Sequence, residues 1–255
     1  MIAKAVKAKL EDIQPLRALF LQANNFQVRY NACHERGWTD SYLLTIDDAV
    51  AGYGAIRGQE TAARDTVFEF YLVPALRRMS RLAFAELLAA SNAKYIECQS
   101  NDPLLASMLF EFARDINSDT VLFADQTATT LAIPGALVRP RRSDDQVFDH
   151  RVEPLGDYVL EMRSEIVATG GFMTHYNAPF ADLYMEVKAD CRGRGYASYI
   201  LQEVKKACYT AGRIPAARCP IGNKASRAAL LKAGMRVCGF MLMGTVKAQK
   251  AEVGR

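Results

Sequence analysis

The chain has 255 residues with a formal net charge of +4; 50% of the residues are hydrophobic and 24% are charged. This composition is typical of a soluble globular protein and excludes a disordered chain, a collagen and a disulfide scaffold. No apolar run approaches the roughly 18–20 residues of a membrane helix. The first ten residues carry dispersed lysines and no apolar core. We therefore expect no secretory signal and a cytoplasmic protein.

The charged residues, cysteines and histidines do not indicate a nucleic-acid or metal site. The densest basic cluster, 139–142, is followed at once by Asp144 and Asp145, which favours a solvated linker over a phosphate-binding track. The 6 cysteines form no CxxC pair, and the 3 histidines form no HExxH motif. We therefore expect no metal, no nucleic acid and no membrane partner, and reduced cysteines.

In the first half, apolar periodicity predicts a helix at 9–23, with Pro15 tolerated near its start. Strands are expected at 41–46, 49–56, 67–73 and 95–98, and further helices at 76–90 and 103–113.

The second half repeats this order of elements. Strands are expected at 157–162, 166–173, 181–187 and 215–219, helices at 195–211 and 223–233, and one or two final strands at 235–246. When Tyr42, Val73 and Asn101 are set on Tyr158, Val187 and Asn223, the offsets are 116, 114 and 122. Since order and spacing agree, we expect an internal duplication, with chance similarity as the alternative.

The segment 183–197 is the most informative for chemistry. A strand leads into Cys191-Arg-Gly-Arg-Gly195, and a helix follows. A helix start offers unpaired backbone N–H groups and the positive end of the helix dipole, and glycines permit unusual dihedral angles. The pattern predicts a site for a pyrophosphate or a similar dianion. A dinucleotide loop would need glycine at Ser198, and no P-loop Gly-Lys-Ser/Thr follows, so a packing turn or another phosphate-bearing cofactor are the alternatives.

The pattern Arg192-Gly-Arg-Gly195-Tyr-Ala197 resembles the signature of the GNAT superfamily of N-acetyltransferases: Arg or Gln, two residues, Gly, one residue, then Gly or Ala. A second family mark follows at Asn223-Lys-Ala-Ser226 and at Leu230-Leu-Lys-Ala-Gly234-Met235, where Met235 replaces Phe. The close resemblance covers about 155–246; the first half resembles the family only in element order.

The resemblance implies an α/β fold of two tandem GNAT-like domains, each a mixed, mostly antiparallel sheet flanked by helices. We expect a degenerate GNAT-like domain at 1–125, a junction at 126–150 and an acetyl-CoA-binding GNAT domain at 151–255. The first half lacks the phosphate signature, so we expect it not to bind coenzyme A. It would instead wall the acceptor site, with Trp38, Tyr30 and His34 lining that site or covering the edge of the core.

The resemblance also implies acetyl-CoA as the cosubstrate and transfer of its acetyl group to a primary amine by direct attack. The backbone of the glycine turn would hold the pyrophosphate, and the preceding strand would pair with the pantetheine arm. The residues expected to bind the cosubstrate are Met185, Val187, Arg192, Gly193, Arg194, Gly195, Tyr196, Ala197, Asn223 and Ser226. A backbone N–H near Val187 would stabilise the oxyanion.

Two carboxylates, Glu186 and Asp182, are the candidate catalytic bases. They stand four apart on a strand and so share a face, and the alternative is that both are exposed surface charges. Cys191 is expected to be structural, because no His or Asn partner is evident. His175 is expected to be a loop residue.

The general acid is missing from its family position. Many members carry a tyrosine seven residues after the position of Asn223, where this chain has Leu230. The alternatives are Tyr196 or Tyr199 as the acid, or unassisted departure of the thiolate, whose thiol has a pKa near 8.5. The alternative function is therefore a non-catalytic acyl-CoA-binding sensor or scaffold. A small amine is preferred over a protein acceptor; its identity and the oligomeric state are not readable from the sequence.

Overall fold

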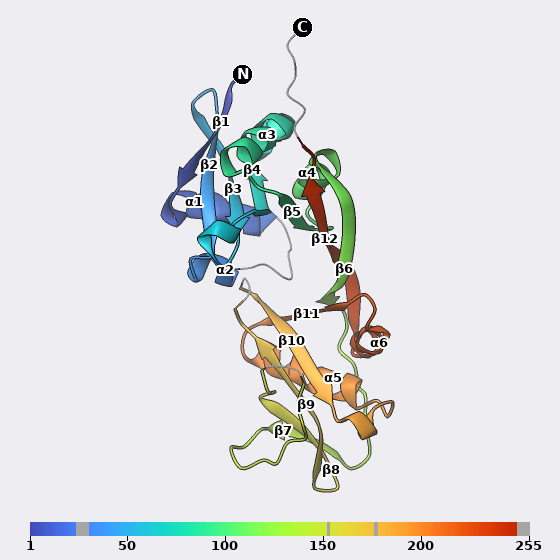
Figure 1. Cartoon of the computed structure of the whole chain (residues 1–255). Coiled ribbons are helices and arrows are strands. Elements are labelled where there is room, and N and C mark those ends of the chain that lie inside the picture. Colours follow the sequence, from blue (N-terminus) through green and yellow to red (C-terminus); the bar gives the residue numbers. More distant parts are fainter. Residues whose placement is uncertain (24–30, 152–153, 176–177, 249–255) are drawn as a thin grey trace. The chain divides into compact units, whose positions relative to one another are not determined.

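The computed structural model describes residues 1–23, 31–151, 154–175 and 178–248 (Figure 1). Two compact units can be distinguished. The described residues of unit 1 come from 1–23, 32–119 and 240–248, and unit 2 consists mainly of 120–239. None of the described helices is both long and apolar enough to cross a membrane.

Unit 1 is built on a mostly antiparallel sheet. Its elements are β1 (Ala3–Ala8), α1 (Leu10–Ala23), α2 (Asn31–Glu35), β2 (Thr39–Ile46), β3 (Ala49–Arg57), η1 (Thr61–Ala63), β4 (Thr66–Leu72), η2 (Pro74–Met79), α3 (Ser80–Ser91), β5 (Tyr95–Gln99) and α4 (Pro103–Phe112). The strands follow the order β1-β2-β3-β4-β5-β12, where β12 is Met235–Val246; β4 and β5 are parallel and the other neighbours antiparallel.

Every residue of β4 is buried, which shows that both faces of the sheet are covered at this strand. On one face the ring of Phe70 meets Phe84 of α3 edge to face at 4.9 Å. On the other, Phe20 of α1 packs on Tyr53 at a centroid distance of 6.1 Å. Successive residues of β4 therefore point alternately toward α3 and α1, which places Glu69 on the α1 face.

Unit 2 repeats the plan with fewer helices. Its elements are β6 (Ala113–Asp125), β7 (Ala136–Pro140), β8 (Tyr158–Met162), β9 (Glu165–Met173), β10 (Phe180–Val187), η3 (Ala189–Cys191), α5 (Tyr196–Thr210), β11 (Ile214–Pro220), α6 (Lys224–Lys232) and β12 (Met235–Val246). The strand order is β6-β11-β10-β9-β8-β7, in which β10 and β11 are parallel.

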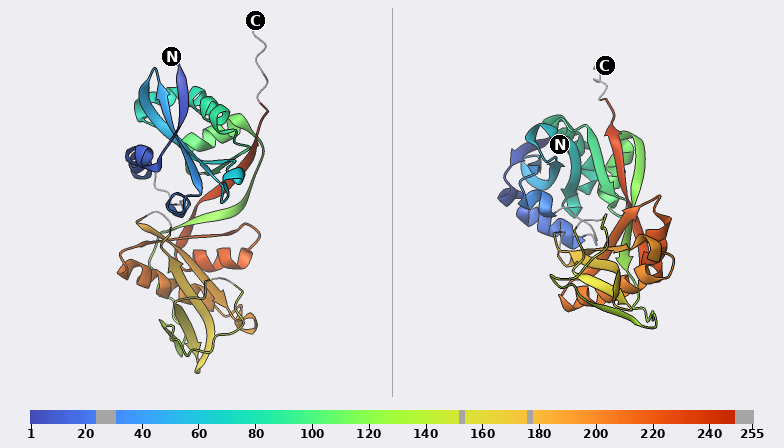
Figure 2. Two further views of the ribbon diagram at one scale, coloured as in Figure 1. Left: turned by 60° about the vertical axis from the view of Figure 1, so that its left-hand side comes forward. Right: turned by 60° about the horizontal axis from the view of Figure 1, so that its bottom comes forward.

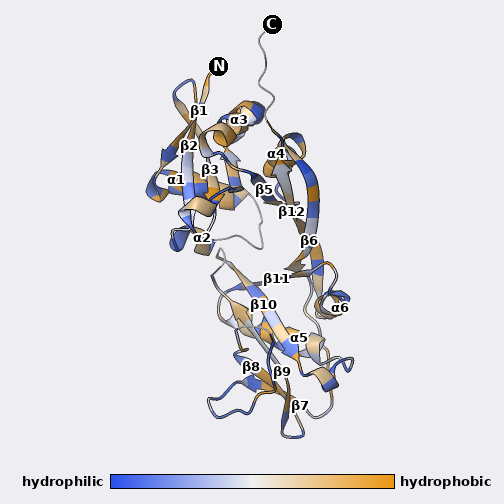
Figure 3. Cartoon of the chain, viewed as in Figure 1, coloured by the Kyte–Doolittle hydropathy of each residue, from blue (hydrophilic) through white to orange (hydrophobic). Residues whose placement is uncertain are grey.

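Helix α5 covers one face of the unit 2 sheet (Figure 2). A Cβ placed on Gly170 would lie 3.2 Å from Val204 and 3.3 Å from Ile200, so the glycine lets the helix approach β9 closely. The ribbon of α5 carries both hydrophobic and hydrophilic colouring (Figure 3), as expected of a helix with one buried face.

The last strand of each unit comes from the other half of the sequence. Strand β6 begins in unit 1 and ends in unit 2, where its residues 120–124 pair with β11. Strand β12 begins in unit 2 and ends in unit 1, where 241–245 pair with β5. The final strand was predicted, but not this exchange, because a strand pattern does not encode its pairing partner.

The expected fold class is confirmed: each unit is a mixed, mostly antiparallel sheet flanked by helices. Three strands were not predicted. Strand β1 consists of alanines with two lysines and one valine, the first part of β6 is largely polar, and β7 ends in a proline at the sheet edge, where strand patterns are weakest. Strand β7 lies inside the expected junction; the division into 1–125, 126–150 and 151–255 stays a prediction.

Candidate functional site

A cavity of about 600 Å³ in unit 2 opens beside the start of α5. It gathers most residues expected to bind the cosubstrate, and Arg194 alone of that set does not line it. The lining residues are Arg151, Met185, Glu186, Val187, Cys191, Arg192, Gly193, Gly195, Tyr196, Ala197, Ser198, Asn223, Ala225, Ser226, Ala228, Ala229 and Lys232. The cavity thus lies between the end of β10, the turn before α5, and α6.

The turn before α5 depends on its glycines. Gly193 has φ of 78° and Gly195 has φ of 83°, the left-handed region that other residues enter only with strain. Gly195 occupies the N-cap position and has no side chain with which to cap the helix. The first-turn N–H groups of α5 therefore point toward the cavity end of the helix, where an anion can accept from them.

Two cationic side chains border this turn. Arg192 donates from Nε to the carbonyl of Val187 at 3.2 Å, which ties the turn to the end of β10. Lys232, the last residue of α6, lines the cavity, and its Nζ lies 4.0 Å from where a Cβ on Gly195 would stand. Lys232 was not among the predicted site residues, because it is distant from the turn along the chain and no local pattern links the two.

Strand β10 leaves one of its edges open beside the cavity. Its register with β11 covers Phe180 to Asp182 in the described structure, and the remaining residues of β10 have no β11 partner in that register. On the opposite edge the N–H of Lys188 donates to Val167 of β9 at 2.9 Å. Because N–H groups alternate along a strand, that of Val187 faces the open edge.

Asn223 caps α6: its Oδ1 accepts from the N–H of Ser226 at 3.0 Å. This hydrogen bond fixes the Asn223 side chain at the cavity wall and holds the start of α6 in place.

Glu186 lies at the cavity wall and is 7% exposed. Its Oε2 accepts from the backbone N–H of Arg151 at 2.8 Å and lies 3.3 Å from Nδ1 of His150. Nε2 of His150 is 2.5 Å from Oγ1 of Thr169, and its ring stacks on Phe148. His150 was not predicted to belong to the site, because nothing near it in the chain indicates that it meets β10.

Asp182 is 3% exposed and does not line the cavity. Its Oδ2 accepts from Nε of Arg218 on β11 at 3.3 Å. Both candidate bases are thus buried, so the alternative of exposed surface charges is wrong. The cavity favours Glu186 over Asp182 as the residue near a reacting group.

The candidate acids and Cys191 differ in whether they line the cavity. Leu230 is 4% exposed and does not line the cavity, whereas Tyr196 lines it and Tyr199 does not. Cys191 lines the cavity, but burial and the neighbouring Asp190 raise the pKa of its thiol, which disfavours the nucleophilic thiolate.

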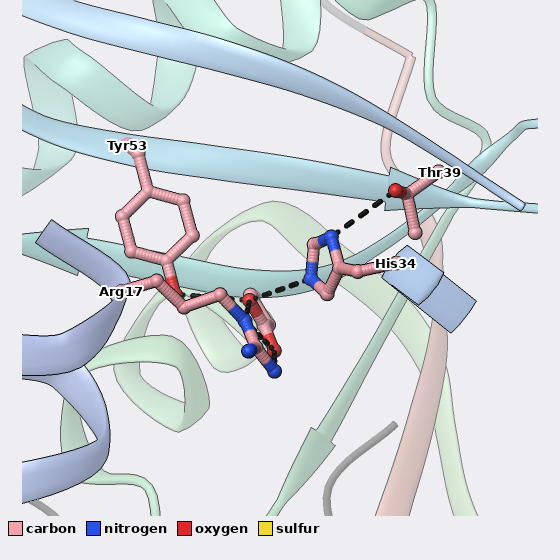
Figure 4. Close-up of polar contacts among 5 residues, drawn as sticks. Arg17, His34, Thr39 and Tyr53 are labelled. Atoms are coloured by element: carbon pink, nitrogen blue, oxygen red, sulfur yellow. Dashed lines mark hydrogen bonds and ion pairs between the residues drawn. The ribbon is translucent and has the colours of Figure 1, made fainter. Parts of the chain in front are cut away.

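Unit 1 buries a different polar cluster (Figure 4). Glu69, fully buried, accepts from Nε of Arg17 at 3.1 Å and from the hydroxyl of Tyr53 at 2.9 Å, and lies 3.1 Å from Nε2 of His34. Burial opposes the charge of Glu69, but Arg17 and His34 together hold the pKa of its carboxyl well below the usual range. His34 therefore belongs to the interior of unit 1.

Of the other residues proposed to wall an acceptor site, Trp38 is half-buried beneath the guanidinium of Arg36, which lies 4.9 Å from the ring centre. Tyr30 lies outside the described residues.

The turn of unit 1 that corresponds to the glycine turn follows β4. Arg77 donates from Nε to the carbonyl of Leu72 at 3.4 Å, as Arg192 does to Val187. Here η2 continues directly into α3, and Ser80 has φ of −55°. This turn contains no glycine and no left-handed residue between 74 and 80.

Residues 9–126 match the family model of the acetyltransferase (GNAT) domain. The match covers the half whose resemblance lay only in element order, while the half with the glycine turn lies outside it. No curated protein sequence matches the chain.

Solved structures show the same fold along nearly the whole chain. An acetyltransferase of the GNAT family from Colwellia psychrerythraea covers 97% of this chain and 100% of its own, at a TM-score of 0.71 and 13% identity. For a tandem GNAT protein from the clavulanic acid biosynthesis pathway, the match covers 97% of this chain and 100% of that protein, with a TM-score of 0.58 and 12% identity. For a GCN5-related N-acetyltransferase from Sphaerobacter thermophilus, the match covers 97% of this chain and 96% of that protein, with a TM-score of 0.56 and 16% identity.

Proposed function

We propose that the protein is an acetyl-CoA-dependent N-acetyltransferase that reacts in the cavity of unit 2, because residues 9–126 match the model of the GNAT acetyltransferase domain and the chain shares the fold of solved GNAT proteins. The GNAT fold supports acyl-CoA-dependent acyl transfer in general. The observation that carries the specific proposal is the glycine turn at the start of α5, which opens onto a cavity beside the part of β10 that lies beyond its described register with β11.

The cavity residues fit acetyl-CoA. The first-turn N–H groups of α5 suit the pyrophosphate, with Arg192 and Lys232 nearby as cations. The open edge of β10 offers backbone groups to the amides of the pantetheine arm. A volume of about 600 Å³ lies within the range of about 300–1,000 Å³ usual for ligand sites.

In the proposed reaction, Glu186 takes a proton from the acceptor's ammonium group, and the neutral amine attacks the thioester carbonyl. A C–N bond forms and the C–S bond breaks, so coenzyme A departs as its thiolate. The N–H of Val187 stabilises the oxyanion of the tetrahedral intermediate. The nitrogen then loses its second proton as the amide forms, and the thiolate, with a thiol pKa near 8.5, takes up that proton from solvent or through Tyr196, which lines the cavity.

We propose a small primary amine as the acceptor and a cytoplasmic site of action. A base that is 7% exposed at a cavity wall is more accessible to a slender amine than to the surface of a folded protein.

The proposal is tested by calorimetry with acetyl-CoA and by thiol release from acetyl-CoA across a panel of small amines. We expect binding, and turnover with at least one amine that falls about 100-fold or more in Glu186→Gln. Asp182→Asn is the matched carboxylate control and should retain more activity. Absence of acetyl-CoA binding would contradict the proposal and favour another phosphate-bearing ligand.

The second candidate function is a non-catalytic acyl-CoA sensor or scaffold. The observation that favours it is Leu230, an apolar, buried residue at the position where many family members have their acid. Tight binding of coenzyme A without turnover on any amine would support the sensor.

A further inference from the structure

Pyrophosphate binding accounts for only part of the positive charge that lines the cavity of unit 2. The lining residues that are charged at neutral pH are Arg151, Glu186, Arg192 and Lys232. Arg192 is tied to the end of β10, and Nζ of Lys232 lies 4.0 Å from where a Cβ on Gly195 would stand, so both belong to the glycine turn. There they can face the negative charges of a pyrophosphate. Arg151 and Glu186 remain, one of each sign.

Arg151 lies beside the proposed base. Its backbone N–H donates to Oε2 of Glu186 at 2.8 Å, so the guanidinium stands no further from this carboxylate than one arginine side chain can reach. Arg151 is an exposed residue, and among the described residues no carboxylate, that of Glu186 included, forms an ion pair with its guanidinium. The guanidinium is therefore available to a ligand that enters the cavity.

Two other cations in this part of unit 2 are already engaged. Lys188 directly follows Val187 but does not line the cavity, and it is paired with Glu165 and Asp190. Nε of Arg141 donates to the carbonyl of Gly156 at 2.9 Å. This leaves Arg151 as the lining cation that can serve the second substrate.

We propose that the acceptor is a small amine that also carries a carboxylate, and that Arg151 binds this acid group. The inference rests on the proposed function, in which Glu186 takes a proton from the ammonium group of the acceptor. An ammonium at Glu186 and a carboxylate at Arg151 match both charges. A diamine would place its second cation near the guanidinium, and a neutral amine would leave the guanidinium without a counter-charge.

The geometry of the two groups supports a carboxylate in particular. A planar guanidinium can donate two parallel hydrogen bonds to a carboxylate, which fixes the orientation of the molecule as well as its charge. An acceptor held at its acid group would present its amine to Glu186 and to the thioester in a defined position. Only the amine reacts, and the acid group leaves the cavity unchanged.

The first test compares acceptors that differ only in the acid group. Amino acids with the amine at the α, β or γ carbon are each paired with their carboxamides, and diamines and amino alcohols complete the panel for thiol release from acetyl-CoA. We expect the best acceptor to be an amino acid, with kcat/KM about 10–100-fold above that of its carboxamide, because a charge-assisted hydrogen bond is lost in the amide.

The outcome of this panel separates the inference from the proposed function. If the best acceptor is a diamine, an amino alcohol or a carboxamide, the enzyme is an acetyltransferase but the role of Arg151 is wrong. If no amine of any kind is turned over, the proposed function fails and the inference falls with it.

The second test removes the guanidinium. Arg151→Gln keeps the backbone N–H that binds Glu186, so we expect KM for the amino acid to rise about 10–100-fold with KM for acetyl-CoA nearly unchanged. The loss for the carboxamide should be much smaller, so the preference for the acid should collapse. Arg151→Lys keeps the charge without the planar donor pair and should retain an intermediate preference.

The matched control is Arg227→Gln, which removes an exposed arginine of α6 that does not line the cavity and should behave as wild type. Equal losses for the amino acid and its carboxamide in Arg151→Gln would overturn the inference. So would a rise confined to the KM for acetyl-CoA, which would assign Arg151 to the cosubstrate.

Discussion

The turn after β4 in unit 1 and the turn after β10 in unit 2 begin alike and then diverge. In each, an arginine five residues further on donates back to the carbonyl of the last strand residue. In unit 1 the chain then passes through η2 into α3 with ordinary helical angles, whereas in unit 2 Gly193 and Gly195 turn it through the left-handed region. The two strand-to-helix turns thus differ in two glycines, and those glycines decide whether the start of the helix is available to an anion.

The same contrast holds for the buried carboxylates. Glu69 is matched by a guanidinium, Arg17, together with His34 and Tyr53, inside unit 1. Glu186 meets an imidazole and a backbone amide at the wall of a cavity. The carboxylate of unit 1 is paired with a permanent cation in the interior, whereas that of unit 2 lies at the wall of a cavity that a ligand can enter.

The largest expected effect is a loss of stability on removing the cation that is paired with Glu69. Arg17→Met should reduce the free energy of unfolding of unit 1 by about 3–5 kcal/mol, because it leaves the charge of Glu69 buried without its cation. Urea denaturation followed by far-UV circular dichroism measures the loss. Lys4→Met, which removes an exposed ion pair with Asp48 in the same unit, is the control and should leave the midpoint unchanged. Equal midpoints for Arg17→Met and wild type would show that Glu69 does not depend on Arg17.

The glycine turn is tested by Gly195→Glu. The added carboxylate would stand at the proposed pyrophosphate position, so affinity for coenzyme A in calorimetry should fall about 100-fold or more. Gly212→Glu is a matched control: Gly212 has φ of 70° and open space around it, so it bears the same backbone strain of about 1–2 kcal/mol away from the cavity. Equal affinity of the two variants would remove the turn from the binding site.

Acid should lower the stability of unit 1 through Glu69. The folded-state pKa of Glu69 is depressed, so its stabilisation is present above the ordinary value of 4.5 and is lost as pH falls below it. Wild-type unfolding free energy should therefore decline between pH 5 and 3 more steeply than that of Glu69→Gln, which is already destabilised at pH 7. Parallel curves for the two proteins would contradict this assignment.

The smallest effect is expected at Cys191. Its raised thiol pKa and the direct-attack reaction give it no chemical step, so Cys191→Ala should change kcat by less than about threefold. Trapping of an acetyl-cysteine at this position by mass spectrometry would contradict the direct mechanism.

The features that sequence reasoning located are those carried by short segments. The residues from Met185 to Ala197 are contiguous, and Asn223 follows at a fixed spacing in the next helix, so a motif describes most of the cavity wall. Glu69 meets Arg17, His34 and Tyr53 only after the chain has folded, and His150 meets Glu186 across the sheet; no local pattern reports such pairs. The exchange of β6 and β12 between the units was not predicted for the same reason, because apolar alternation identifies strands without assigning their neighbours.

The position of β12 bears on the order in which the protein is completed during translation. Residues 241–245 supply the strand that pairs with β5, and Leu242 and Val246 pack against the core of unit 1. The ribosome therefore synthesises the residues between β5 and β12 before β5 can acquire this neighbour. Until then β5 is an open edge on a nascent chain, and β12 completes the pairing of a strand that was made much earlier.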